Sequence, residues 1–220
     1  MTQIILIRHG ETLWNTQGRI QGHLDSPLTQ MGFTQARILA ERFKSEEIAA
    51  LYSSDLGRAY DTARCISEIK GLPVLSQPCL RERNFGILQG VQKKTLESQF
   101  PETFRYYQSH DPDYVIPDGE SLKQFSQRCV ECIEKLVQEY AGKRILVVAH
   151  SGVLVSLFKH TLALPVEAPR SFVSSNTSVN VFSYQNGKWM LEVWGDLSHL
   201  HGGKSLDDDS SDYTGPVVYQ

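Results

Sequence analysis

Two histidines follow apolar segments that are each long enough to form a buried strand. His9 follows Ile4-Ile-Leu-Ile-Arg8, and His150 follows Ile145-Leu-Val-Val-Ala149. If both segments are parallel strands of one sheet, the histidines emerge at the same edge, where open α/β sheets bind their ligands. Arg8 adds a permanent positive charge beside His9. Two imidazoles and a guanidinium suit phosphoryl transfer without a metal ion, because this reaction depends on positioning and on charge stabilisation.

Phosphoryl transfer to histidine also needs further positive charge and an acid. Arg58 is predicted to lie in the first turn of a helix capped by Asp55, where free amides and the helix dipole favour an anion. Glu82 is the candidate acid, since it could protonate the departing alkoxide and later activate water as a base. Neutral hydrogen-bond donors are expected from the loop after the first strand, at Asn15, Gln21 and Gly22.

Each of these residues also has a structural interpretation when it is taken alone. His9 could be a turn histidine, Glu82 a surface carboxylate and His150 a buried structural histidine. A metal site at His9, Glu11 and His150 is a further alternative, but no helical His-Glu-x-x-His pattern supports it. The combination of residues favours phosphoryl transfer through a phosphohistidine, with no metal.

Length and charge narrow the class of protein. The 220 residues fit one α/β domain, and the formal net charge of -3 gives no broad attraction to nucleic acid or to anionic membranes. No segment approaches the length of a membrane span. The chain starts without the pattern of a secretory signal, so we expect a cytoplasmic protein.

Strand and helix patterns alternate along the chain, which predicts βαβ units and a mostly parallel sheet. The expected strands cover residues 3–8, 50–53, 74–76 and 145–149, and a hairpin of 178–184 and 188–194 turns at Asn186-Gly187. The expected helices include one capped by Thr29, one capped by Asp55 that stops before Gly71, one over 95–107, one ending at Gly142, and one over 153–162. We predict one domain over 1–201, with a lid or insert at about 81–119, and a polar, flexible tail over 202–220.

The cysteines are expected to be free thiols. Cys129 and Cys132 lie on one apolar helical stripe, and buried cysteine packs as a small hydrophobe. A redox pair or a zinc half-site is the alternative, but no second ligand pair stands at a suitable spacing. The remaining cysteines, Cys65 and Cys79, add no such pattern.

From Ile4 to about Leu200 the chain resembles the histidine phosphatase superfamily, in its phosphoglycerate mutase-like branch. Four segments carry the resemblance: Leu6-Ile-Arg-His-Gly-Glu-Thr-Leu-Trp-Asn15, Ser53-Ser-Asp-Leu-Gly-Arg58, Leu80-Arg-Glu-Arg83 and Val147-Val-Ala-His-Ser-Gly152. Pro117-Asp-Gly-Glu-Ser121 and Gly195-Asp-Leu-Ser-His-Leu200 are also similar to bacterial members of this branch. The resemblance implies a three-layer α/β/α sandwich, with helices on both faces of the sheet and no metal.

The same resemblance implies roles for individual residues. His9 is the residue phosphorylated, Arg58 the second phosphate-binding arginine, Glu82 the proton donor and His150 the second histidine. Further substrate contacts are expected at Arg83, Phe85, Lys93, Ser151, Gly152 and His199. The alternative for Arg83 and Lys93 is a solvated basic face, and for His199 a surface histidine.

We therefore predict a metal-independent phosphomonoesterase for a small phosphorylated metabolite, such as phosphoserine or another phospho-carboxylate. A phosphoglycerate mutase using the same phosphohistidine, with 2,3-bisphosphoglycerate as cofactor, is the alternative; otherwise no cofactor is expected. Arg105 stands alone where such mutases carry an arginine pair, and a short lid favours hydrolysis. An inactive phospho-ligand binding module is a third hypothesis. The hairpin offers an edge strand through which a homodimer could form.

Overall fold

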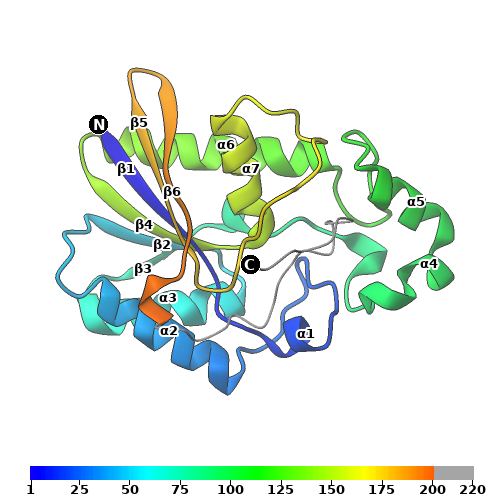
Figure 1. The fold of residues 1–220 in the computed structure, drawn as a ribbon, viewed down its shortest axis with the longest axis horizontal. Helices are drawn as coiled ribbons and strands as arrows, with labels where there is room; N and C mark the ends of the chain where they lie inside the picture. The colour runs from blue at the N-terminus through cyan, green and yellow to red at the C-terminus, as the bar shows by residue number, and fades with distance from the viewer. Residues whose placement is uncertain (201–220) are drawn as a thin grey trace, which may run out of the picture.

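The computed structural model describes residues 1–200, which form a six-stranded sheet in the order β3-β2-β4-β1-β5-β6 (Figure 1). The strands are β1 (Thr2–Arg8), β2 (Ala50–Ser53), β3 (Val74–Ser76), β4 (Arg144–Ala149), β5 (Val179–Gln185) and β6 (Lys188–Asp196). β3, β2, β4 and β1 are mutually parallel, whereas β5 and β6 form the antiparallel hairpin. The predicted mostly parallel sheet is confirmed.

Helices cover both faces of this sheet because its central strands are apolar on both sides. The four long helices are α2 (Gln30–Arg42), α3 (Gly57–Lys70), α6 (Leu122–Glu139) and α7 (Ser151–Thr161). Along β1, Ile4 and Leu6 enter the core beneath α6 and α7, while Ile5 and Ile7 enter the core beneath α2 and α3. The result is the three-layer α/β/α sandwich that the resemblance implies.

The segment between β3 and α6 builds one side wall of the molecule (Figure 1). It contains η1 (Pro78–Leu80), η2 (Gly86–Leu88), η3 (Lys93–Thr95), α4 (Leu96–Gln99) and α5 (Pro101–Ser109). Leu88, Leu96 and Ile116 form a small separate core together with Ile20, which lies after the short helix α1 (Leu13–Thr16). The prediction that residues 81–119 act as a lid over the site stays a prediction.

The single helix expected over 95–107 is two helices. α4 ends at Gln99, and α5 begins at Pro101. The residue before a proline disfavours helical backbone, and Phe100 has the non-helical angles φ -137° and ψ 59°. Proline itself suits the first position of a new helix, which explains the restart.

The two predicted helix caps have different outcomes. Thr29 caps α2, because its hydroxyl accepts a hydrogen bond from the Gly32 amide at 2.9 Å. Asp55 does not cap α3: Leu56 is the N-cap residue, without a side-chain hydrogen bond. Asp55 instead accepts two hydrogen bonds from Arg81, at 2.8 and 2.5 Å. Asp55 therefore ties the chain before Glu82 to the start of α3.

The expectation of free thiols is wrong for two of the four cysteines. Cys79 and Cys132 form a disulfide that joins η1 to α6. Cys65 and Cys129 are free and buried, as predicted. The apolar periodicity places Cys132 on the inner face of its helix correctly, but it carries no information about what packs opposite that face.

The hairpin turns at Asn186 and Gly187, with φ of 53° and 76°, as the sequence predicts. After β6, the short helix η4 (Ser198–Leu200) packs against α2. The polar tail predicted over 202–220 lies outside the described residues. Within residues 1–200, none of the helices has both the length and the apolarity to cross a membrane. A homodimer stays a prediction.

Candidate active site

His9 and His150 meet at one edge of the sheet, as their strand patterns predict. β1 and β4 pair in parallel with Arg8 opposite Ala149, and the His9 amide donates to the Ala149 carbonyl at 3.0 Å. The two imidazole centroids are 5.3 Å apart, and both side chains are buried. Residues separated by 141 positions in sequence therefore form one constellation.

The local backbone selects a tautomer for His9. Its Nδ1 lies 2.7 Å from the Gly10 carbonyl oxygen, which can only accept a hydrogen bond. Nδ1 therefore carries the proton in a neutral ring, and Nε2 keeps the lone pair. Gly10 itself makes a close approach, because a Cβ there would lie 2.7 Å from the carbonyl oxygen of Gly32 in α2.

Two buried guanidinium groups flank the histidines. Arg8 is 2% exposed and donates to the Ser174 carbonyl at 2.6 Å. Arg58, the second residue of α3, is 1% exposed and donates to Asp25 at 2.9 Å and to the Gly22 carbonyl at 2.7 Å. Burial and these contacts orient both cations toward the same cavity.

His150 is held as a neutral imidazole. Complete burial is the main cause that lowers its pKa well below the ordinary value, and the positive charge of Arg58 lowers it further. Within residues 1–200 neither ring nitrogen of His150 has a hydrogen-bond partner. A neutral ring still presents one N–H, which can be donated to a phosphoryl oxygen.

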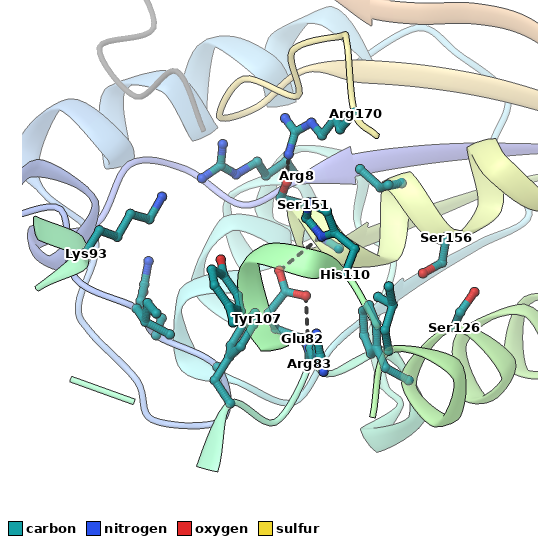
Figure 2. A pocket seen from close by; sticks show the side chains of 18 of the residues that line it. Arg8, Glu82, Arg83, Lys93, Tyr107, His110, Ser126, Ser151, Ser156 and Arg170 are labelled. Atoms are coloured by element: carbon teal, nitrogen blue, oxygen red, sulfur yellow. Dashed lines mark hydrogen bonds between the residues drawn. The ribbon is translucent and has the colours of Figure 1, made fainter. Parts of the chain in front are cut away.

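Glu82 is held at the amino end of α7 by backbone amides. Its carboxylate accepts from the Gly152 amide at 3.0 Å and from the Arg83 amide at 2.9 Å (Figure 2). A Cβ on Gly152 would collide with this carboxylate and would lie 2.8 Å from the Phe125 ring. Gly152 therefore positions Glu82, a role that its predicted substrate contact did not include.

A second set of contacts holds the backbone of the Glu82 segment. Arg128 donates to the carbonyls of Cys79 at 2.8 Å and of Arg81 at 3.1 Å, and it pairs with Glu120 at 2.7 Å. His23 Nε2 lies 2.9 Å from the Glu82 carbonyl oxygen. Neither residue stands in a strand-end motif, so the sequence does not indicate their support of Glu82.

The three predicted neutral donors lie in the cavity wall. Thr12 caps α1, and Asn15 completes the capping box by accepting from the Thr12 amide at 3.1 Å through its Oδ1. Gly22 has φ +59°, and its carbonyl holds Arg58. The Oε1 atom of Gln21 is buried and has no hydrogen-bond partner within the described chain. Because buried polar atoms are normally hydrogen-bonded, we expect the Gln21 side chain to contact a polar group of a bound ligand.

Of the remaining predicted contacts, all but one line the cavity: Arg83, Phe85, Lys93, Ser151 and Gly152. The exception is His199, which the structure places beside α2, with Nδ1 3.4 Å from Arg42. The ion pair of Arg42 with Asp196, at 2.5 Å, anchors this end of the chain to α2. A motif match in sequence does not reveal that anchoring.

Further residues that were not predicted also line the cavity: Arg19, Tyr107, His110, Ser126, Ser156, Lys159 and Arg170. Gly152, Ser156 and Lys159 have the helical spacing that places them on one face of α7, which is a signal that the sequence offered. Arg170 lies in the connection between α7 and β5, where no periodicity marks it.

The cavity has a volume of about 180 Å³ and a strongly positive lining (Figure 2). Among residues 1–200, its lining includes seven lysines or arginines and a single carboxylate, Glu82. No group of three or more His, Cys, Asp or Glu side chains within residues 1–200 could hold a metal ion. The arrangement offers a nucleophile, an acid and cationic groups to an anionic ligand.

Comparison with known proteins identifies the class. The model of the histidine phosphatase superfamily (branch 1) matches residues 4–197, so the chain belongs to this superfamily and is an enzyme. It is 41% identical to phosphoglycerate mutase-like protein 4 of Arabidopsis thaliana over 202 residues, covering 90% of this chain and 86% of that protein. It is 40% identical to the metal-independent phosphoserine phosphatase of Arabidopsis thaliana over 203 residues, covering 91% and 84%.

The solved structure of Bacillus stearothermophilus YhfR has the same fold. It superposes with a TM-score of 0.85 and 32% sequence identity, covering 91% of this chain and all of that one. These likenesses establish the family and the fold, but not the substrate or the roles of individual residues.

Proposed function

We propose that the protein is a metal-independent phosphomonoesterase that hydrolyses a small phospho-carboxylate through a phosphohistidine on His9. The observation that carries this proposal is the cavity in which His9, Glu82 and two buried guanidiniums converge. The relative named a metal-independent phosphoserine phosphatase supports the choice of reaction.

In the first step, Nε2 of His9 attacks phosphorus and the bond from phosphorus to the ester oxygen breaks. Glu82, protonated at this stage, transfers its proton to the departing alkoxide and becomes a carboxylate. Arg8, Arg58 and the N–H of His150 bind the non-bridging oxygens, where negative charge collects.

In the second step, a water molecule attacks the phosphohistidine. The Glu82 carboxylate takes a proton from this water while the nitrogen–phosphorus bond breaks. Inorganic phosphate and neutral His9 are released, and Glu82 is again protonated for the next cycle. The two steps replace one difficult transfer with two easier ones.

Phosphoglycerate mutase activity is the second candidate. The sequence from Phe85 to Lys93 resembles that of cofactor-dependent mutases, and both of these residues line the cavity. The relative named phosphoglycerate mutase-like protein 4 also favours it. A mutase would return the phosphoryl group to the second oxygen of the substrate in place of water.

A phosphorus NMR time course separates the two candidates. The protein is incubated with phosphoserine or with 3-phosphoglycerate in the presence of EDTA, with and without 2,3-bisphosphoglycerate. We expect inorganic phosphate to appear in every case and His9→Ala to abolish it. Conversion of 3- to 2-phosphoglycerate without phosphate would make the protein a mutase, and loss of activity in EDTA would contradict the metal-independent mechanism.

A further inference from the structure

Arg170 belongs to the same cavity as the reacting groups, although it comes from the far end of the chain. It lies in the connection between α7 and β5 and lines the cavity together with His9 and Glu82. Figure 2 shows its guanidinium close to Arg8 and Ser151. No family motif in the sequence points to it.

Three hydrogen bonds give the Arg170 guanidinium a defined orientation. Nε donates to the Phe172 carbonyl at 2.8 Å, Nη1 to the Ser151 hydroxyl at 3.2 Å and Nη2 to the Ser174 hydroxyl at 2.9 Å. The guanidinium carbon also lies 5.7 Å from the centre of the Phe172 ring. All three hydrogen bonds go to neutral oxygen atoms, and together they fix the plane of the guanidinium.

Ser174 couples Arg170 to the phosphoryl site. The carbonyl of this fully buried serine holds Arg8, while its hydroxyl holds Arg170 and lies 2.7 Å from the Ser151 hydroxyl. Ser151 is the neighbour of His150. Ser174 therefore supports both the Arg8 and the Arg170 guanidinium, next to the position proposed for the phosphoryl group.

The position of Glu82 indicates which part of a substrate would reach Arg170. The acid must stand beside the ester oxygen, and its carboxylate contacts the Gly152 amide at the amino end of α7. Ser151, which holds Arg170, immediately precedes Gly152. The leaving group thus departs on the side of the cavity to which Arg170 is bound.

We propose that Arg170 binds a carboxylate of the leaving group, so that the cavity selects phosphomonoesters with a carboxylate on the carbon next to the ester carbon. A guanidinium donates charge-assisted hydrogen bonds to a carboxylate, and Nη1 and Nη2 of Arg170 each carry a second N–H besides the one donated to Ser151 or Ser174. This inference rests on the proposed phosphatase function and names the part of the substrate that Arg170 recognises.

The opposite wall holds the rival candidate, Arg83. Its guanidinium is buried, but Nε and Nη2 both donate to the Glu120 carbonyl at 3.2 Å, and the group lies 5.6 Å from the centre of the Phe85 ring. Arg83 thus belongs to the wall that supports Glu82. A direct comparison of Arg83 and Arg170 variants separates the two assignments.

Phosphoserine and phosphoethanolamine differ only in the carboxylate, so their ratio of kcat/KM measures its recognition. We expect Arg170→Gln to lower kcat/KM for phosphoserine by about 10- to 100-fold, since a charge-assisted hydrogen bond is lost. Hydrolysis of phosphoethanolamine and of p-nitrophenyl phosphate should change by less than about threefold. Arg170→Lys should keep part of the preference, and the exposed Arg64→Gln should leave all three rates unchanged.

Three results would overturn the assignment of Arg170: an equal loss on all three esters, an unchanged preference in Arg170→Gln, or a lost preference in Arg83→Gln alone. Failure of the wild-type protein to hydrolyse p-nitrophenyl phosphate would instead contradict the phosphatase function. In that event, calorimetric binding of phosphoserine and phosphoethanolamine to His9→Ala, with and without Arg170→Gln, tests the same preference without turnover.

Discussion

The position of the proposed acid depends on a glycine. Gly152 donates its amide to Glu82, and any side chain at this position would collide with that carboxylate. The proposed acid therefore depends on a neighbour that has no chemistry of its own. Gly152 is therefore a positioning residue, because it acts through Glu82 and takes no direct part in the reaction.

Gly152→Ala should lower kcat for phosphoserine by about 100-fold, because it displaces an acid that contributes roughly 10²- to 10⁴-fold. The test is a double-mutant cycle with Glu82→Gln, measured by steady-state kinetics. If Gly152 acts through Glu82, the alanine should add little in the Glu82→Gln background. Fully additive losses would contradict this role.

The buried His150 should make the free energy of unfolding depend on pH. Burial lowers its pKa in the folded protein, so the unfolded chain binds a proton first as the pH falls below about 6.5. The free energy of unfolding should then decrease by up to about 1.4 kcal/mol per pH unit. The pKa of His23 is also lowered, mainly by burial, and acts in the same direction.

Urea unfolding of the wild type and of His150→Gln, from about pH 7.5 down to about pH 5, measures this contribution. We expect the curve of the variant to be flatter in this range, by up to one bound proton. Parallel curves for the two proteins would show that His150 does not resist protonation in the folded state.

At the scale of elements, the disulfide links the segment that leads to Glu82 with α6. The bond closes a loop between residues 53 positions apart. Closing a loop of this length in the unfolded chain stabilises the folded state by about 4 kcal/mol. The same α6 carries Arg128, which holds the backbone on either side of the acid.

Reducing agent should therefore lower the midpoint of thermal unfolding of the wild type, and Cys132→Ala should lower it in the same way. The reductant should have no further effect on Cys132→Ala. Mass spectrometry after alkylation of the unfolded, unreduced protein should find labels on Cys65 and Cys129 alone. Labels on all four cysteines would contradict the disulfide.

Sequence patterns predict the strands and helices that have a clear apolar pattern of their own. The ends of β1 and β4 follow from two apolar runs, and the register of parallel strands then brings His9 and His150 together. Arg170 and the Cys79–Cys132 bond lie where irregular segments pack against regular ones. Such contacts depend on tertiary packing, so local spacing cannot reveal them.

At the scale of the whole molecule, charge is distributed unevenly. The formal net charge is -3, yet the part of the chain that the structure describes contributes seven basic side chains and one carboxylate to the cavity lining. An anionic substrate is therefore attracted to the cavity in spite of the net charge. The attraction acts over a long distance through solvent, so dissolved salt weakens it.

We expect kcat/KM for phosphoserine to fall by about tenfold between about 50 mM and about 500 mM NaCl, because salt screens this attraction. The value of kcat should change little, since the buried charges around the bound phosphoryl group are poorly screened. Phosphoethanolamine should show a smaller decrease. Equal salt dependence of both parameters would mean that salt acts on the chemical step or on the fold.

The phosphohistidine is the central claim, and its direct detection is the most decisive measurement. The protein is mixed with phosphoserine, quenched within one turnover in base, where phosphohistidine survives, and digested for mass spectrometry. We predict one phosphoryl group on the peptide that contains His9 and its loss on acid treatment. With p-nitrophenyl phosphate, whose leaving group needs little acid catalysis, the phosphoryl group should accumulate in Glu82→Gln, because the second step loses its base. Phosphate release with no phosphorylated His9, or phosphorylation at another residue, would contradict the account.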